Sequence, residues 1–525
     1  MRVALGRFAG ACALAALLAG CGGATTTAAK PESTLGVLAG SELKDLEPFF
    51  GDIEHDTGVR IVPTYVGTIA GADRIASGDK SVDVAWFAQD KYLSLADTGH
   101  HVIARERVMI SPVIFGVKES KAKAFGWTGH SGVTWRQIAD KASSGALHYA
   151  MTNPTTSNTG FSAVIGVASA FAGKGDALRP SDIDAAKLTG FFSGQKLVAG
   201  SSGWLAEAYL REQDGLDGII NYEASLISLN ADPALKEKLV LLYPKDGFIT
   251  ADYPLDLVNA AKRDAYDKVI AYLKSPAVQT KIMNATHRRP VDSSVPLASD
   301  IPKALLVDLP FPATLATVNG LLTRYLNHDR IPPHTFYVID TSGSMEGSRL
   351  ASVRAALGIL AGTDDSATGA FARFEDRELI TLISFSESPQ APVNFAMHRA
   401  NDPATFAGVK SYAAGLVADG NTAIFGALEE ALDEAGRARS ADAHHYDSIV
   451  LMTDGENNRG DDWPAFEVKW KALPAAERAI KIFPVFIGEA NPEQLGRVAT
   501  LTGGRAFDAR SEPLPAIFKE IRGYQ

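Results

Sequence analysis

Short apolar segments alternate with stretches of helical periodicity along almost the whole chain. An apolar run of about four to eight residues is typical of a buried strand, and helices between such runs favour parallel strands joined by crossovers. We expect strands at residues 34–38, 59–65, 82–86, 111–117, 148–151, 196–199, 218–222 and 239–243, and again at 335–340, 379–385, 393–395, 448–453, 480–487 and 505–507. This pattern predicts an α/β protein.

The length of the chain indicates that this α/β pattern covers several domains. At 525 residues the chain is too long for one core, and a prior of about 150 residues per domain predicts roughly three globular units. Prolines 302, 310 and 312 precede a helical pattern at 313–327 and prolines 332 and 333 follow it, and prolines end helices and stiffen linkers. We therefore expect a first α/β region at 35–300, a proline-bounded linker with a helix at 301–332, and a second α/β domain at 333–525.

The N-terminus has the features of an export signal. Arg2 and Arg7 precede an apolar stretch at 8–18 that is too short to span a bilayer, and small residues lead to Cys21. The sequence Leu-Ala-Gly-Cys at 18–21 resembles the lipobox of bacterial lipoproteins. The resemblance implies that 1–20 is a signal peptide, that Cys21 is lipidated, and that 21–34 is a flexible tether to the cell envelope, on its periplasmic or surface face. The alternative is a plain secretory signal with a chance cysteine.

Composition and missing motifs exclude several classes of function. The formal net charge of −10 argues against nucleic acid as a partner and against a polybasic membrane patch. The chain contains no G-x-S-x-G, H-E-x-x-H or Walker loop, and no histidine lies near the polar loops at 340–344, 419–422 and 453–456 in the sequence. We therefore expect a binding protein rather than an enzyme.

Polar loops follow several predicted strands of the first region. Open α/β sheets bind ligands at the carboxyl ends of their strands, and hydroxyls at a helix start leave backbone amides free for an anion. Helix capping alone is the alternative explanation for such hydroxyls. The candidate residues for a ligand cleft are Ser41, Glu42, Phe87, Ser157, Asn158, Thr159, Tyr222 and Glu223.

These loops, together with residues 83–87, 243–247 and 272–279, resemble the type II periplasmic solute-binding fold. The resemblance implies two lobes, at about 35–110 plus 250–300 and at 111–249, with a cleft for a small solute that an ABC importer takes up or a sensor detects. An oxyanion is one option, but Glu42 and Glu223 lie beside the same cleft and the loops contain no arginine. The other option is a scaffold that has lost solute binding.

The second domain carries hard oxygen ligands on three loops. Asp340, Ser342 and Ser344 form a D-x-S-x-S sequence directly after the apolar run 336–339, Thr422 starts a predicted helix, and Asp454 follows a predicted strand. Carboxylate and hydroxyl oxygens suit Mg²⁺ or a similar divalent cation. Because the carboxyl ends of parallel strands share one sheet edge, we expect these five side chains to meet.

The five residues resemble the metal-ion-dependent adhesion site (MIDAS) of von Willebrand factor A (VWA) domains, over nearly all of 333–525. The resemblance implies a doubly wound, Rossmann-like domain that holds Mg²⁺, or Mn²⁺ or Ca²⁺, and accepts an acidic oxygen from a protein partner. The expected function is metal-dependent adhesion by an envelope-anchored lipoprotein. A solute receptor with the VWA domain as a coupling module is the alternative, and a site kept only for fold stability is a third possibility.

Overall fold

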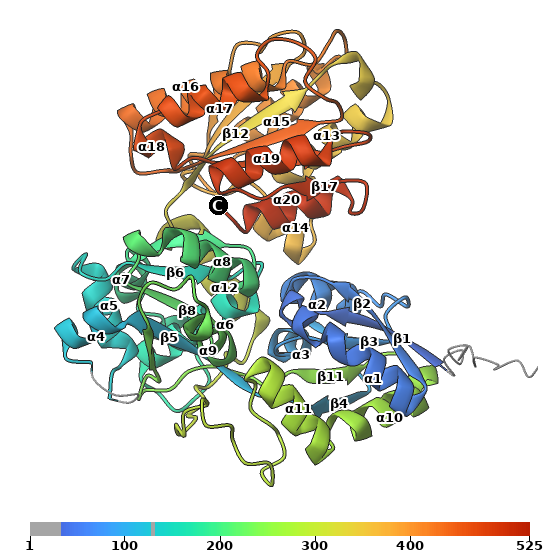
Figure 1. Ribbon diagram of the computed structural model, residues 1–525, viewed down its shortest axis with the longest axis vertical. Coiled ribbons are helices and arrows are strands. Elements are labelled where there is room, and N and C mark those ends of the chain that lie inside the picture. Colours follow the sequence, from blue (N-terminus) through green and yellow to red (C-terminus); the bar gives the residue numbers. More distant parts are fainter. Residues whose placement is uncertain (1–32, 128–131) are drawn as a thin grey trace, which may run out of the picture.

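The computed structural model describes residues 33–127 and 132–525, which form three β-sheets flanked by helices (Figure 1). The predicted signal peptide, Cys21 and most of the tether lie outside the described residues. The first strand, β1 (Ser33–Ala39), already begins within the predicted tether at 21–34. Within the described residues, no helix combines the length and apolarity needed to span a bilayer.

The first lobe is a five-stranded mixed sheet in the order β2-β1-β3-β11-β4. Strands β1, β2 and β3 are parallel, whereas β11 runs antiparallel to both β3 and β4. The elements of this lobe are β1, α1 (Glu47–Thr57), β2 (Val59–Tyr65), α2 (Thr68–Ala76), β3 (Val84–Trp86), α3 (Lys91–Ala96), β4 (Ala104–Arg107), β11 (Pro254–Leu257), α10 (Arg263–Leu273) and α11 (Pro276–Thr286).

The second lobe contains a six-stranded sheet in the order β10-β5-β8-β6-β7, with β9 paired to β5. Its central helix α6 is buried along almost its whole length because its residues are nearly all small or apolar. The elements are β5 (Ser111–Lys118), α4 (Glu119–Phe125), α5 (Trp135–Ser143), β6 (Tyr149–Thr152), α6 (Asn158–Ala172), α7 (Ala185–Phe192), β7 (Gln195–Ala199), α8 (Ser202–Glu212), β8 (Gly218–Tyr222), α9 (Glu223–Ala231), β9 (Leu239–Leu242) and β10 (Thr250–Ala251).

Three of the antiparallel strands were not predicted. Strands β4, β10 and β11 are short, and no apolar run as clear as that of β2 or β5 identifies them. Residues 250–251 were assigned to the first lobe, but β10 pairs with β5 and therefore belongs to the second sheet. The chain thus crosses between the lobes after β10 rather than before it.

The segment expected to be a linker is packed against both lobes. Its helix α12 (Leu315–Arg324) buries Val318 and Leu322. Asn319 accepts a hydrogen bond from the hydroxyl of Tyr92 in the first lobe, at 3.3 Å, and Arg324 donates to the hydroxyl of Thr189 in the second, at 2.9 Å. Residues 301–332 are therefore an integral part of the fold.

The third sheet is doubly wound, in the order β14-β13-β12-β15-β16-β17, with only the edge strand β14 antiparallel. Alternate residues of β12 face opposite layers: Phe336 packs with the core that includes α16, and Tyr337 with the core that includes α13 and α20. The main elements are β12 (Pro333–Asp340), α13 (Ser348–Gly358), α14 (Ala367–Ala372), β13 (Leu379–Phe385), β14 (Val393–Ala396), α15 (Pro403–Gly415), α16 (Ile424–Ala441), β15 (Tyr446–Thr453), α17 (Trp463–Ala472), β16 (Lys481–Phe486), α19 (Pro492–Thr502), β17 (Phe507–Asp508) and α20 (Leu514–Arg522).

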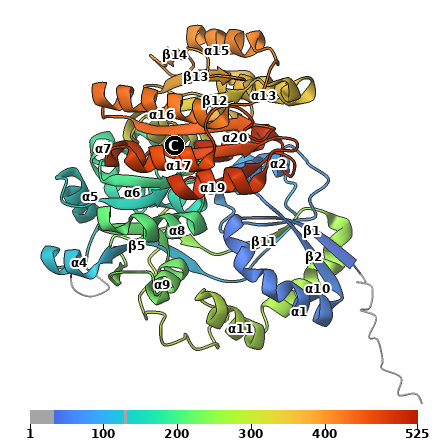
Figure 2. The same ribbon diagram turned by 45° about the horizontal axis from the view of Figure 1, so that its top comes forward.

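The third domain rests on both lobes, as two views of the molecule show (Figures 1 and 2). Against the first lobe, the backbone N–H of Thr368 on α14 donates to Asp73 on α2 at 3.0 Å. Against the second lobe, the ring of Tyr524 packs edge-on against Trp204, with ring centroids 6.0 Å apart. The domain therefore bridges the two lobes.

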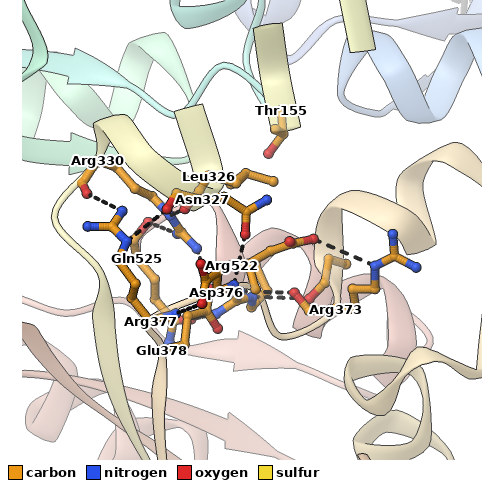
Figure 3. A network of polar contacts seen from close by, with 12 residues as sticks. Thr155, Leu326, Asn327, Arg330, Arg373, Asp376, Arg377, Glu378, Arg522 and Gln525 are labelled. Carbon is orange, nitrogen blue, oxygen red and sulfur yellow. Dashed lines mark hydrogen bonds and ion pairs between the residues drawn. The ribbon is translucent and has the colours of Figure 1, made fainter. Parts of the chain in front are cut away.

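A buried polar network joins this domain to the segment that leads into it (Figure 3). Arg330 and Arg522 both donate to the carboxylate of Glu378, and all three side chains are almost fully buried. Arg330 also donates to the carbonyl oxygen of Gln525 at 2.9 Å. Because Glu378 is the shared counter-ion of both buried guanidinium groups, it ties the segment before β12 to the end of α20.

Candidate metal centre and interlobe site

The three loops predicted to hold a metal meet at the carboxyl edge of the third sheet. The N–H of Ser342 donates to Asp340 Oδ1 at 2.8 Å, and Thr453 Oγ1 donates to the other oxygen of Asp340 at 2.5 Å. The hydroxyls of Ser342 and Ser344 are 3.1 Å apart, and Ser344 Oγ donates to Asp454 Oδ1 at 2.8 Å. Four of the five predicted residues are thus connected by hydrogen bonds.

Thr422 lies beside this group on its own loop. A Cβ placed on Gly455, the neighbour of Asp454, would be 3.5 Å from Thr422 Oγ1. The loops are held together by backbone bonds, since Gly343 N–H donates to the carbonyl oxygen of Gly420 at 3.0 Å. The structure therefore brings all five predicted side chains to one place.

The donor set fits a hard divalent cation. It offers two carboxylates and three hydroxyls, and Mg²⁺ prefers such oxygens and keeps some of its waters. Burial raises the pKa of Asp340, and the nearby charge of Asp454 acts in the same direction, although hydrogen bonds from Thr453 and Ser342 oppose it. A bound cation would favour the ionised carboxylate at this position. In the described parts of the chain, no group of three or more His, Cys, Asp or Glu offers an alternative metal site.

Sequence reasoning missed a basic residue at this site. Arg349, in the first turn of α13, donates to Asp454 Oδ2 and, at 3.1 Å, to the carbonyl oxygen of Ser344. No motif identifies Arg349, because its contact with Asp454 spans 105 positions in the chain. A side-chain cation therefore already contacts one of the predicted ligands.

A hollow of about 420 Å³ adjoins two of the loops that carry candidate metal ligands, those at 340–344 and 419–422. Its lining includes Thr341, which lies between two predicted ligands, and Asp419, which lies on the loop of Thr422. Ser384, Ser411 and Tyr412 also line it. The lining is rich in hydroxyls. This hollow leaves open space beside the loops that carry the candidate ligands.

Three of the eight predicted cleft residues lie together where the two lobes meet. They are Glu42, Asn158 and Tyr222. Asn158 Nδ2 donates to the hydroxyl of Tyr222 at 3.0 Å, and burial, then the charge of Glu42, raises the pKa of Tyr222 well above its ordinary value. Glu42 Oε1 and Asn158 Oδ1 are buried without a hydrogen-bond partner among the described residues. Buried polar atoms of this kind are costly unless a ligand or water pairs with them.

Four other predicted cleft residues contact side chains of the protein: Glu223, Thr159, Phe87 and Ser157. Glu223 pairs with Arg289 through two contacts of 2.7 Å, and Thr159 shares a hydrogen bond of 2.7 Å with Thr152. Phe87 is fully buried, and a Cβ on Gly71 of α2 would be 2.3 Å from its ring. Ser157 lies 3.2 Å from Thr159 through their hydroxyls.

Ser41, the eighth predicted residue, begins a short 3₁₀ helix next to Glu42. Two residues at this site were not predicted. The guanidinium of Arg288 donates to the carbonyl oxygen of Glu42 at 2.9 Å and to Asp45 at 2.7 Å, and it lies 4.8 Å from the ring centroid of Tyr253. The loops near Glu42 contain no arginine, but the fold supplies one from a distant segment.

Comparisons with known proteins agree with this architecture. Residues 37–285 match the family model described as bacterial extracellular solute-binding protein, and residues 336–520 match the von Willebrand factor type A domain. The uncharacterized protein sll0103 of Synechocystis sp. is 31% identical over 137 residues, which are 26% of this chain and 28% of that protein. The inter-alpha-trypsin inhibitor heavy chain H4 of Sus scrofa is 33% identical over 153 residues, 28% of this chain. The match spans only 15% of the length of that heavy chain.

Solved structures resemble each region separately. The periplasmic binding protein AfuA from Actinobacillus pleuropneumoniae is 12% identical and covers 56% of this chain and 98% of its own, with a TM-score of 0.43. A von Willebrand factor type A protein from Catenulispora acidiphila is 18% identical and covers 37% of this chain and 42% of its own, with a TM-score of 0.30. By the family models alone, the chain combines a region that matches bacterial extracellular solute-binding proteins, residues 37–285, with a von Willebrand factor type A domain, residues 336–520.

Proposed function

We propose that this protein binds an acidic residue of a partner protein through a divalent cation held by the VWA domain. The observation that carries the proposal is the convergence of Asp340, Ser342, Ser344, Thr422 and Asp454 at one sheet edge. When bound, Mg²⁺ supplies a Lewis-acidic position that accepts a carboxylate oxygen. The carboxylates supply the charge that retains the cation, and the adjoining hollow accommodates residues next to the partner's acidic group.

The solute-binding domain and the export-like N-terminus support a location outside the cytoplasm. Solute-binding domains of this family are extracellular by their description. With the lipobox at 18–21, we propose that lipid on Cys21 anchors the chain to the cell envelope. Both matched domains are binding modules, so the proposed activity is not enzymatic.

The proposal is tested by affinity capture from envelope extract on the full chain. Capture of a partner should occur in Mg²⁺, disappear in EDTA, and disappear with Asp340→Ala. Asp433→Asn, which removes one exposed carboxylate from α16, is the matched control and should behave as wild type. Partner capture that survives both EDTA and Asp340→Ala would exclude metal-dependent binding.

A solute receptor is the second candidate function. It is favoured by the buried, unpartnered oxygens of Glu42 and Asn158 where the lobes meet. A thermal-shift screen of oxyanions, metals and amino acids on the full chain should find a stabilising solute. Glu42→Gln and Asn158→Ala should abolish that shift, and a screen with no hit would count against this role.

A further inference from the structure

Arg349 lies where it neutralises one of the predicted metal ligands. Its side chain is about one-third exposed, at 32%, whereas that of Asp454 is completely buried. Asp454 Oδ1 accepts from Ser344 Oγ, and Oδ2 accepts from Arg349. Both oxygens of this carboxylate are therefore engaged, one by another predicted ligand and one by a cation from the chain itself.

Contacts with two loops hold the guanidinium of Arg349 in position. It donates to the carbonyl oxygen of Ser344 in the D-x-S-x-S loop as well as to Asp454. On the loop after β16, Gly488 leaves room for it, since a Cβ there would be 2.7 Å from Arg349 Nε. The arginine thus contacts two of the loops that supply ligands and passes close to a third loop.

We infer that Arg349 is a built-in competitor for the cation, and that it must leave Asp454 for the metal site to load. The inference rests on the proposed function, because it concerns regulation of that same site. An arginine is always charged, and two cations near one buried carboxylate repel strongly where water is scarce. The side chain of Arg349 is partly exposed, so it can move into solvent once its bond to Asp454 is broken.

This arrangement has a direct consequence for metal affinity. Without Arg349, the carboxylate of Asp454 would carry its full charge toward the cation. Charge-assisted hydrogen bonds to carboxylates are among the stronger ones, so removing this bond should tighten cation binding about tenfold. If Arg349 instead only orients Asp454, its removal should weaken cation binding.

Mn²⁺ titration of the full chain separates the two possibilities. The concentration of free Mn²⁺ is measured by electron paramagnetic resonance. Arg349→Gln should bind Mn²⁺ about tenfold more tightly than wild type. Arg349→Lys keeps the charge but loses the forked geometry and should lie between the two. The control Arg497→Gln removes an exposed charge from α19 and should match wild type.

The outcomes distinguish this inference from the proposed function. Equal or weaker binding by Arg349→Gln overturns the competitor role and leaves the metal site intact. Absence of Mn²⁺ binding by both wild type and Arg349→Gln contradicts the proposed function itself. As a second measurement on wild type, the Nε–H nuclear magnetic resonance signal of Arg349, assigned with Arg349→Lys, should shift when Mg²⁺ is added. An unchanged signal in a protein that binds Mg²⁺ also overturns the inference.

Discussion

The side-chain amide of Asn153 donates a hydrogen bond of 3.2 Å to the carbonyl oxygen of Arg522, 369 positions away. Asn153 opens the polar loop after β6 in the second lobe, and Arg522 ends α20 of the VWA domain. The side chain of Arg522 pairs in turn with Glu378. A loop that sequence patterns associate with ligand binding therefore contributes at its first residue to the contact between domains.

The Glu378 network predicts a large loss of stability when its anion is removed. Glu378→Gln leaves two buried guanidinium groups, those of Arg330 and Arg522, without their shared carboxylate. The unfolding free energy should fall by about 3–5 kcal/mol, as expected for an uncompensated buried charge. Urea denaturation measures this change.

The control for this prediction is Glu493→Gln, which breaks an exposed pair with Arg497. An exposed pair of this kind contributes roughly 0–1 kcal/mol. Similar losses for the two variants would mean that the buried network does not tie the segment before β12 to the end of α20.

The contact between the VWA domain and the first lobe predicts a local change in dynamics. Asp73→Ala removes the acceptor for the N–H of Thr368 at the start of α14. Loss of one hydrogen bond of about 1 kcal/mol should speed amide exchange at Thr368 roughly fivefold. Hydrogen–deuterium exchange measured by mass spectrometry detects this change.

Asp79→Ala serves as the control, because Asp79 pairs with Arg74 of α2 and, within the described residues, forms no hydrogen bond or ion pair with the VWA domain. Exchange across α14 should then match wild type. Unchanged exchange in Asp73→Ala would show that α14 is held by other contacts.

The main strands could be predicted from the sequence because their signal is local. The strands at 59–65, 218–222 and 379–385 have the predicted bounds, since each is an apolar run bordered by polar or turn residues. The two-residue strand β10 carries no such run. Its strand character depends on pairing with β5, which lies more than 130 positions earlier in the chain.

In the candidate sites, too, residues close together in the sequence could be predicted, whereas the contacts that Glu42 and Glu223 make with distant segments could not. Asp340, Ser342 and Ser344 are adjacent in sequence, so the motif and its geometry are visible together. Arg288 reaches Glu42 across 246 positions, and only tertiary structure creates that pair. Glu223 was expected in the ligand cleft because it follows β8, but its charge is satisfied by Arg289 from another segment.

A cluster of acidic residues on the first lobe predicts a pH-dependent stability. Burial raises the pKa of Asp252 to about 6, the charge of Asp90 adds to the shift, and Arg107, 4.0 Å away, opposes it. The folded state therefore keeps a proton that the unfolded chain releases near pH 4. The stability from this group is fully present below about pH 4 and is lost as the pH rises through about 6.

Asp252→Asn should remove this loss. Relative to wild type, the variant should gain roughly 1–2 kcal/mol of unfolding free energy between pH 4 and pH 8, after allowance for the partial exposure of the group. Denaturation curves at several pH values measure the difference. For the control Asp56→Asn, at an exposed position, the plot of unfolding free energy against pH should be parallel to that of wild type. A parallel plot for Asp252→Asn would contradict the predicted titration.

The proposed metal site is best probed by a variant that leaves its loops in place. Asp340→Ala would also remove the acceptor for Ser342 N–H and Thr453 Oγ1, so a loss of binding could reflect altered loops. Ser344 is exposed, and its hydroxyl contacts only Ser342 and Asp454 within the described chain. Ser344→Ala should therefore weaken Mg²⁺ binding about tenfold, as loss of one oxygen ligand implies, with a melting temperature close to that of wild type.

Calorimetric titration with Mg²⁺ measures this effect, and Ser348→Ala on the first turn of α13 is the matched control. Ser348 is also exposed, and its position after the D-x-S-x-S loop gives it no predicted contact with the cation. Because both changes remove one exposed hydroxyl, a difference in Mg²⁺ affinity isolates the role of position 344. Equal affinities for the two variants would remove Ser344 from the ligand set and leave the cation to Asp340, Ser342, Thr422 and Asp454.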